Sequence, residues 1–116
     1  MKKKYFGFAV ADSMFSGDCG IRRVVITPDQ VRAAAAAGEF TPCLNPSHKA
    51  TIDAMHQRFG IDVAIPATPP RVALVPGDSI VVMGVRGLPR LEDRHEYTEE
   101  EIASATFSFA EYTVTD

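Results

Sequence analysis

The stretch RVALVPGDSIVVMGV, residues 71–85, places a Gly-Asp turn between two apolar, valine-rich runs. Valine and isoleucine favour strands, and glycine followed by aspartate is typical of a tight turn. The pattern therefore predicts a hairpin of two strands, 71–75 and 79–85, joined through residues 76–78. The rest of the chain must supply the other strands of the sheet and the helices that cover it.

Strand composition recurs toward both ends of the chain. KKYFGFAVA (3–11) is nearly all apolar past its start, as in a strand that is buried on both faces. RRVVIT (22–27) and the alternating TFSFAEYTV (106–114) predict two more strands. FTPCL (40–44) is short and extended, and its proline suits a sheet edge.

Three helices are expected between these strands. Segment 27–38 starts with the capping pattern TPDQ and ends at a glycine, and segment 98–104 starts with the capping pattern TEEE. In LNPSHKATIDAMHQRFG (44–60), an Asn-Pro pair precedes one apolar helical face, formed by Ile52, Met55, His56 and Phe59. The sum is an α/β fold, with a single mixed sheet of about five to six strands and about three flanking helices.

The composition suits one soluble domain. The chain has 116 residues, of which 46% are hydrophobic and 23% charged. Its net charge of −3 provides no general attraction for DNA, and no apolar run is long enough to span a membrane as a helix. Cys19 and Cys43 lack a paired spacing and are typical of reduced thiols, which predicts a cytoplasmic protein.

His48 falls in the first turn of the helix predicted within 44–60. The first turn of a helix has unpaired N–H groups and the positive end of the helix dipole, and both favour a bound phosphate. Ser47 and Thr51 add hydroxyl donors there, and Lys49 adds a positive charge. In this position an imidazole can give a proton to a leaving oxygen. The alternative is a histidine that only caps the helix or lies at the surface.

The charged loop RLEDR (90–94) is a second candidate. An arginine such as Arg90 can hold a phosphate in a bidentate manner and stabilise developing negative charge. Asp93, three residues on, can orient this arginine or accept a proton, although a solvated loop is the alternative. Ser13 can donate a hydrogen bond to a ligand. Neither metal-ligand spacing nor a phosphate-binding glycine loop is present, so no metal and no cofactor are expected.

The order of these motifs resembles that of the viral ring nucleases, small type III anti-CRISPR proteins of archaeal viruses and phages. SHKAT (47–51) is similar to their small-residue-His-x-[Ser/Ala]-Thr motif, and segment 71–85 to their Arg-Val strand and Gly-Asp hairpin. RLEDRHEYTEEEI (90–102) is similar to their Arg-Leu-x-acidic segment, and FSFAEYTV (107–114) to their terminal aromatic strand. The likeness covers most of a single domain, residues 1–116.

This resemblance implies a homodimer whose subunits enclose a cleft for cyclic tetra-adenylate, a cyclic oligoadenylate messenger of type III CRISPR defence. The implied reaction is a metal-independent transesterification, in which a ribose 2′-hydroxyl attacks its own 3′-phosphate and the 5′-oxygen leaves. The products are linear, with a 2′,3′-cyclic phosphate. The resemblance makes His48 the general acid and Arg90 the group that stabilises the charge. It places Asp93 beside the 2′-hydroxyl and Ser13 near the ligand.

Several residues depart from the family pattern. Ser47 replaces a glycine that is common before the histidine, and Asp93 is one methylene shorter than the family glutamate. The link GVRGLPR (84–90) is longer than usual, which makes Arg86 an alternative to Arg90 as a ligand-binding or charge-stabilising residue.

The departures leave two other functions open. One is a sponge that binds a cyclic nucleotide without cutting it. The other is a structural or interaction protein that reuses the fold, in which His48 has no chemical role.

Overall fold

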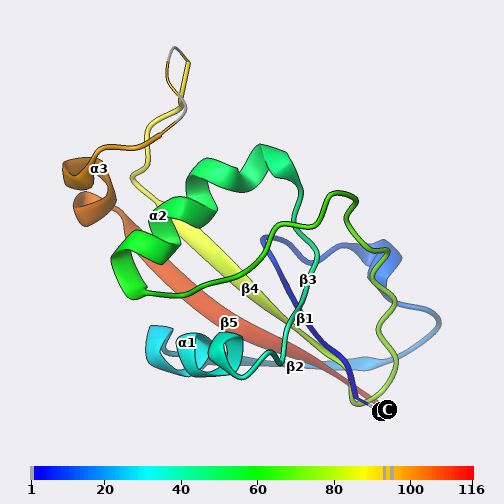
Figure 1. The fold of residues 1–116 in the computed structure, drawn as a ribbon. Coiled ribbons are helices and arrows are strands. Elements are labelled where there is room, and N and C mark those ends of the chain that lie inside the picture. Colours follow the sequence, from blue (N-terminus) through cyan, green and yellow to red (C-terminus); the bar gives the residue numbers. More distant parts are fainter. Residues whose placement is uncertain (1, 93, 95) are drawn as a thin grey trace.

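The computed structural model describes residues 2–92, 94 and 96–116. Its strands are β1 (Lys4–Gly7), β2 (Gly20–Ile26), β3 (Thr41–Pro42), β4 (Ser79–Arg86) and β5 (Thr106–Thr115). Its α-helices are α1 (Pro28–Ala36), α2 (Lys49–Phe59) and α3 (Glu99–Ser104), and two short 3-10 turns are Asp12–Met14 and Pro46–His48. These elements confirm the predicted α/β fold with one mixed sheet and three helices (Figure 1).

The strands form one five-stranded sheet in the order β2-β5-β4-β1-β3. β4 pairs in parallel with β1 and antiparallel with β5, β1 pairs in parallel with β3, and β2 pairs antiparallel with β5. Therefore β1, β3 and β4 all end at the same edge of the sheet. In open α/β sheets this edge, outside the carboxyl ends of the parallel strands, is where ligands bind.

The two faces of the sheet are covered differently. α1 and α2 lie over one face (Figure 1), and side chains from both helices join the largest core cluster with β1, β4 and β5. The buried members that the helices supply are Val31, Ile52 and Met55. The opposite face carries a smaller cluster, in which Val72 and Leu74 of the segment before β4 pack on Tyr5, Ile80 and Val114.

The predicted hairpin at 71–85 is wrong, although its second strand is present as β4. Residues 71–75 contribute only an isolated bridge between Leu74 and Phe15. The physical reason is that both sides of β4 are already occupied, one by β1 and the other by β5. The turn itself is held by the buried Asp78, whose carboxylate accepts the Lys3 N–H at 2.9 Å and the Val75 N–H at 3.2 Å.

The helix predicted from Asn45 onward begins with the 3-10 turn, and its α-helical part begins at Lys49. Gly60 ends it in the left-handed conformation, with φ of 70°. His56 was expected on the apolar face, and this prediction is wrong because His56 is exposed. It follows the buried Met55 by one position, which turns it by about 100° around the helix axis and away from the core.

The capping patterns are confirmed at the other two helices. The Thr27 hydroxyl accepts the Gln30 N–H at 3.1 Å, and the Thr98 hydroxyl accepts the Glu101 N–H at 3.1 Å. Each cap satisfies a backbone donor that the helix leaves unpaired. Among the residues that the structure describes, no helix has the length and apolarity that a membrane crossing requires.

Candidate functional site

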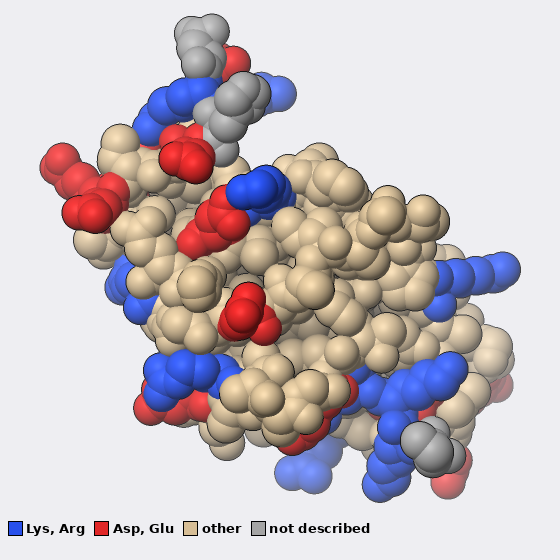
Figure 2. Space-filling view, viewed as in Figure 1, with Lys and Arg blue, Asp and Glu red and all other residues tan. Residues whose placement is uncertain are grey.

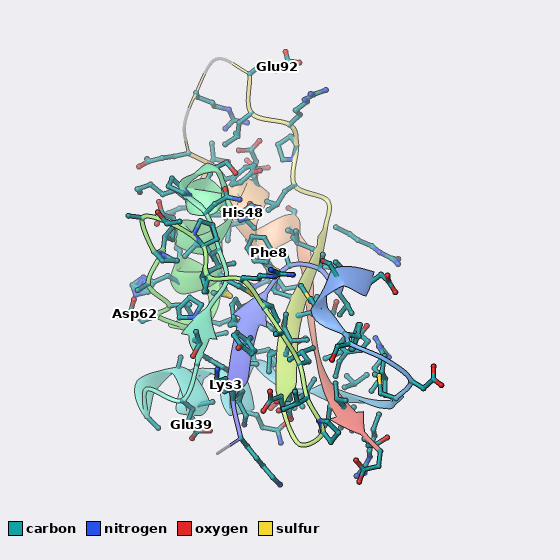
Figure 3. All side chains as sticks on the ribbon, turned by 90° about the vertical axis from the view of Figure 1, so that its right-hand side faces the viewer. Lys3, Phe8, Glu39, His48, Asp62 and Glu92 are labelled. Atoms are coloured by element: carbon teal, nitrogen blue, oxygen red, sulfur yellow. The ribbon has the colours of Figure 1, made fainter. Side chains whose placement is uncertain are left out.

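His48 lies near the ends of β1 and β3, as the last residue of the 3-10 turn and the N-cap of α2. Its half-buried imidazole meets the ring of Phe8 edge-on, with 4.7 Å between the ring centroids. Its backbone N–H donates to the Asn45 carbonyl at 2.9 Å. Figure 3 shows His48 beside Phe8, on the same side of the molecule. These contacts hold the imidazole in one position at the start of the helix.

The side chain of His48 makes one further hydrogen bond. Its Nδ1 accepts the backbone N–H of Asn45 at 3.4 Å. Because an accepting ring nitrogen carries no proton, the proton of the neutral imidazole must be on Nε2. Within the described part of the chain no group pairs with Nε2, so the Nε2–H group can donate to a ligand.

A cavity of about 370 Å³ adjoins this histidine. Its walls are formed by residues that follow β1, residues that follow β3 and residues of the segment before β4. Its lining consists of Phe8, Ala9, Ser13, Met14, Cys43, His48, Pro70, Arg71 and Val72. The cavity thus brings together two residues that the sequence singled out, His48 and Ser13, although they are far apart along the chain.

Arg71 is the lining residue that sequence reasoning missed as a site residue. It is the only lysine or arginine among the described residues of the lining. Its guanidinium can hold a phosphate in a bidentate manner, which the lysines of the chain cannot do. The available signal was the arginine that opens the segment 71–85, which was assigned only to a strand.

The other candidates at the start of α2 lie outside the cavity lining. The Ser47 hydroxyl donates to the Asn45 side-chain oxygen, and Thr51 is half-buried in the first turn of α2. Lys49 binds Asp53 one turn later at 2.6 Å, and this carboxylate raises the pKa of Lys49. Lys49 is therefore partnered within its own helix.

Arg86 and Arg90 also lie outside the lining. Arg86 is the exposed last residue of β4, and Arg90 is exposed on the segment that follows. This segment projects from the body of the protein (Figure 1), and Glu92 lies far from His48 at its outer end (Figure 3). Asp93 lies outside the described residues.

Cys43 lies in the cavity wall as a half-buried thiol that donates to the Phe6 carbonyl at 3.1 Å. Burial raises the pKa of this thiol, so it is protonated at neutral pH and is a poor nucleophile. Space around it is tight, because a Cβ placed on Gly7 would lie 2.7 Å from the Cys43 Sγ. Cys43 is therefore a packing residue of the wall, where β1 and β3 lie side by side.

Charges elsewhere are dispersed. On the helical face that Figure 2 shows, Lys and Arg side chains are interspersed with Asp and Glu, and no charge of one sign covers that face. No group of three or more His, Cys, Asp or Glu side chains within the described part of the chain could hold a metal ion. The chemistry that the cavity can offer therefore comes from an imidazole, a hydroxyl and a guanidinium.

The fold and the cavity define a small mixed α/β protein with a ligand-sized cavity at the carboxyl edge of its parallel strands. No family model and no curated protein matches the chain. Among solved structures it is similar to B116 of Sulfolobus turreted icosahedral virus, with a TM-score of 0.69 and 16% identity. The match covers 96% of this chain and 98% of that chain, so the fold is shared over nearly the full length with a protein of an archaeal virus.

Proposed function

We propose that the protein is a metal-independent ring nuclease, which cleaves cyclic tetra-adenylate and so opposes type III CRISPR defence in the host cytoplasm. The observation that carries this proposal is the half-buried His48 at a cavity that also contains Ser13 and Arg71. Self-cleavage of RNA requires positioning, a proton donor and stabilisation of charge, because the substrate supplies its own nucleophile. The three side chains match these requirements.

Each group has a defined step in the proposed reaction. The ribose 2′-oxygen forms a bond to the adjacent phosphorus and loses its proton, while the bond from phosphorus to the 5′-oxygen breaks. For this step His48 takes up a proton on Nδ1, which ends its contact with the Asn45 N–H, and the imidazolium then donates its Nε2 proton to the leaving 5′-oxygen and becomes neutral. Arg71 binds the non-bridging oxygens, whose negative charge grows in the transition state. The family resemblance assigns the further charge stabilisation to Arg90 or Arg86, and the proton of the 2′-hydroxyl to Asp93.

A second copy of the chain is part of this proposal. The cavity of about 370 Å³ is at the small end of ligand pockets, which range from about 300 to 1,000 Å³. It does not enclose a ring of four nucleotides. A two-fold homodimer would present two such cavities to one ring and match its symmetry. In such a dimer, the family resemblance would place Arg90 of the projecting segment in the shared cleft.

The test compares two histidines of the same region. Wild-type protein, His48→Ala and His56→Ala are each incubated with cyclic tetra-adenylate in excess EDTA, and the products are separated by chromatography. His56 is the matched control because it is exposed on the same helix and lies outside the cavity lining. Wild type and His56→Ala should yield linear products with 2′,3′-cyclic phosphate ends, whereas His48→Ala should leave the ring intact. Equal cleavage by all three proteins would contradict the assignment of His48.

A non-cleaving sponge is the second candidate. It is favoured by one observation, which is that the described lining of the cavity contains no carboxylate that could accept the proton of the 2′-hydroxyl. The same experiment distinguishes the two functions if binding is followed by calorimetry. A sponge would bind the ring and release it intact from wild type and from both variants.

A further inference from the structure

β2 occupies one edge of the sheet and, within the described chain, pairs with β5 alone. Its five central residues are exposed. They include three large apolar side chains, Ile21, Val24 and Val25, which are 49%, 40% and 68% exposed. The free edge of such a strand carries backbone N–H and C=O groups that can pair with another strand. β2 is therefore a surface that a further strand can extend.

The other outer strand of the sheet, β3, is protected from pairing with a further strand, whereas β2 is not. β3 has only two residues, and one of them is Pro42, which has no N–H to offer. β2 has seven residues and no proline, and it stays in register with β5 along its whole length. Of the usual devices that protect an edge, β2 has only charge, from Arg22 and Arg23.

The side chains of β2 form a defined pattern on each face of the sheet. Ile21, Arg23 and Val25 are on one face, opposite Val114, Tyr112 and Ala110 of β5, whereas Arg22 and Val24 are on the other face. Arg23 is held in place, because its Nε donates to the Tyr112 hydroxyl at 3.0 Å and its guanidinium lies over the Tyr112 ring. The free edge thus presents two adjacent cations between apolar residues.

The two arginines argue against a second copy of the chain as the occupant. Antiparallel pairing of β2 with itself about a two-fold axis near its centre would place Arg22 and Arg23 opposite or diagonal to the same residues of the other copy. Like charges in these cross-strand positions are destabilising, and opposite charges are stabilising. Charge complementarity therefore selects an acidic strand, while the apolar neighbours supply the burial.

We propose that the free edge of β2 binds an extended acidic segment of another protein, which adds a sixth strand to the sheet. Backbone hydrogen bonds supply the affinity, and side chains on the two faces supply the specificity. A segment that pairs with Ile21–Val25 should place acidic residues opposite the two arginines and apolar residues opposite the other three positions. Read from its N-terminus, a parallel segment has the order apolar, acidic, acidic, apolar, apolar, and an antiparallel segment has the reverse order. This edge is across the sheet from the cavity of His48, so the proposal is independent of the proposed nuclease activity.

The test uses fluorescent peptides TIDEVVT and TVVEDIT, which present this pattern in the two directions, and TIKKVVT as the basic counterpart. Polarisation should show binding of one acidic peptide and about tenfold weaker binding of the basic one. Hydrogen exchange should show new protection at alternate amides of β2. N-methylation of alternate peptide nitrogens should abolish binding, since it removes the donors that would pair with the strand edge.

The variant Arg22→Glu/Arg23→Glu should reverse the preference in favour of TIKKVVT. Lys2→Glu/Lys3→Glu is the matched control, because it makes the same change in net charge elsewhere and should keep the original preference. Circular dichroism would confirm that both variants are folded. The proposal would be overturned if the acidic and basic peptides bound equally well, or if N-methylated peptides bound as tightly as the unmodified ones. Sedimentation showing a dimer with protected β2 amides before any peptide is added would instead make a second copy the occupant.

Discussion

At the scale of single residues, the candidate site depends on how its neighbours fix one imidazole. Phe8, which follows β1, supports the ring of His48, and the Asn45 N–H donates to its Nδ1. Sequence patterns predicted His48 and Ser13, because a helix start and a loop after a strand can be recognised locally. Arg71 could not be predicted in this way, because its place in the cavity depends on how residues 61–78 pass from one face of the sheet to the other.

The arginines can be separated by their effects on binding and turnover. Arg71→Ala should weaken binding of cyclic tetra-adenylate about tenfold to a hundredfold, since hydrogen bonds to charged groups are worth about 1.5–3 kcal/mol. Arg90→Ala should lower the rate of turnover more than Arg86→Ala does, as the family resemblance implies. Calorimetry and single-turnover kinetics on the three variants measure these effects. A larger loss of turnover in Arg86→Ala would transfer the charge-stabilising role to that residue.

At the scale of elements, local signals predicted where helices begin but did not predict how strands pair. In each of α1 and α3, the two residues that form the cap lie within four positions of the sequence. The sequence alone was therefore sufficient to predict where these helices begin. The Gly-Asp turn was also local, and it indicated a hairpin, but the partners of β4 come from distant parts of the chain. The register between β4 and β1 is set by the buried faces that they share, which no short motif records.

The N-terminus of α3 should have a distinct acid response. Arg94, which precedes the helix, binds Glu101, and this ion pair lowers the pKa of Glu101 from 4.5 to about 2. A carboxyl whose pKa is depressed by folding stabilises the folded state above its unfolded pKa. That contribution is lost as the pH falls from about 4.5 toward 2. NMR titration of the Glu101 carboxyl should show the low pKa, and Arg94→Gln should raise it. An unchanged value in Arg94→Gln would assign the shift to the Thr98 cap instead.

At the scale of the whole molecule, the cavity and the exposed strand edge lie in different parts of one sheet. The cavity lies at the carboxyl edge of the parallel strands β1, β3 and β4, whereas the free strand edge lies at β2. The helices cover one face and leave the β2 end of the sheet with exposed apolar side chains. The two proposed ligands, a nucleotide ring at the cavity and a strand at β2, would therefore not compete for the same surface.

The stoichiometry of ring binding tests the homodimer. Titration of the inactive His48→Ala variant with cyclic tetra-adenylate should saturate at one ring for two chains. Sedimentation in the presence of the ring should give the mass of a dimer. Saturation at one ring per chain, with the mass of a monomer, would contradict a shared cleft and would require the cavity of one chain to serve the ring alone.

The close approach of Gly7 and Cys43 in the cavity wall also limits how the sequence can diverge. A Cβ at position 7 would lie 2.7 Å from the Cys43 sulfur, so this sulfur would have to shift or position 43 would have to become smaller. Cys43→Ala or Cys43→Gly should therefore make Gly7→Ala easier to accommodate. Among natural variants of this protein, a residue larger than glycine at position 7 should occur more often with a small residue at position 43 than with cysteine.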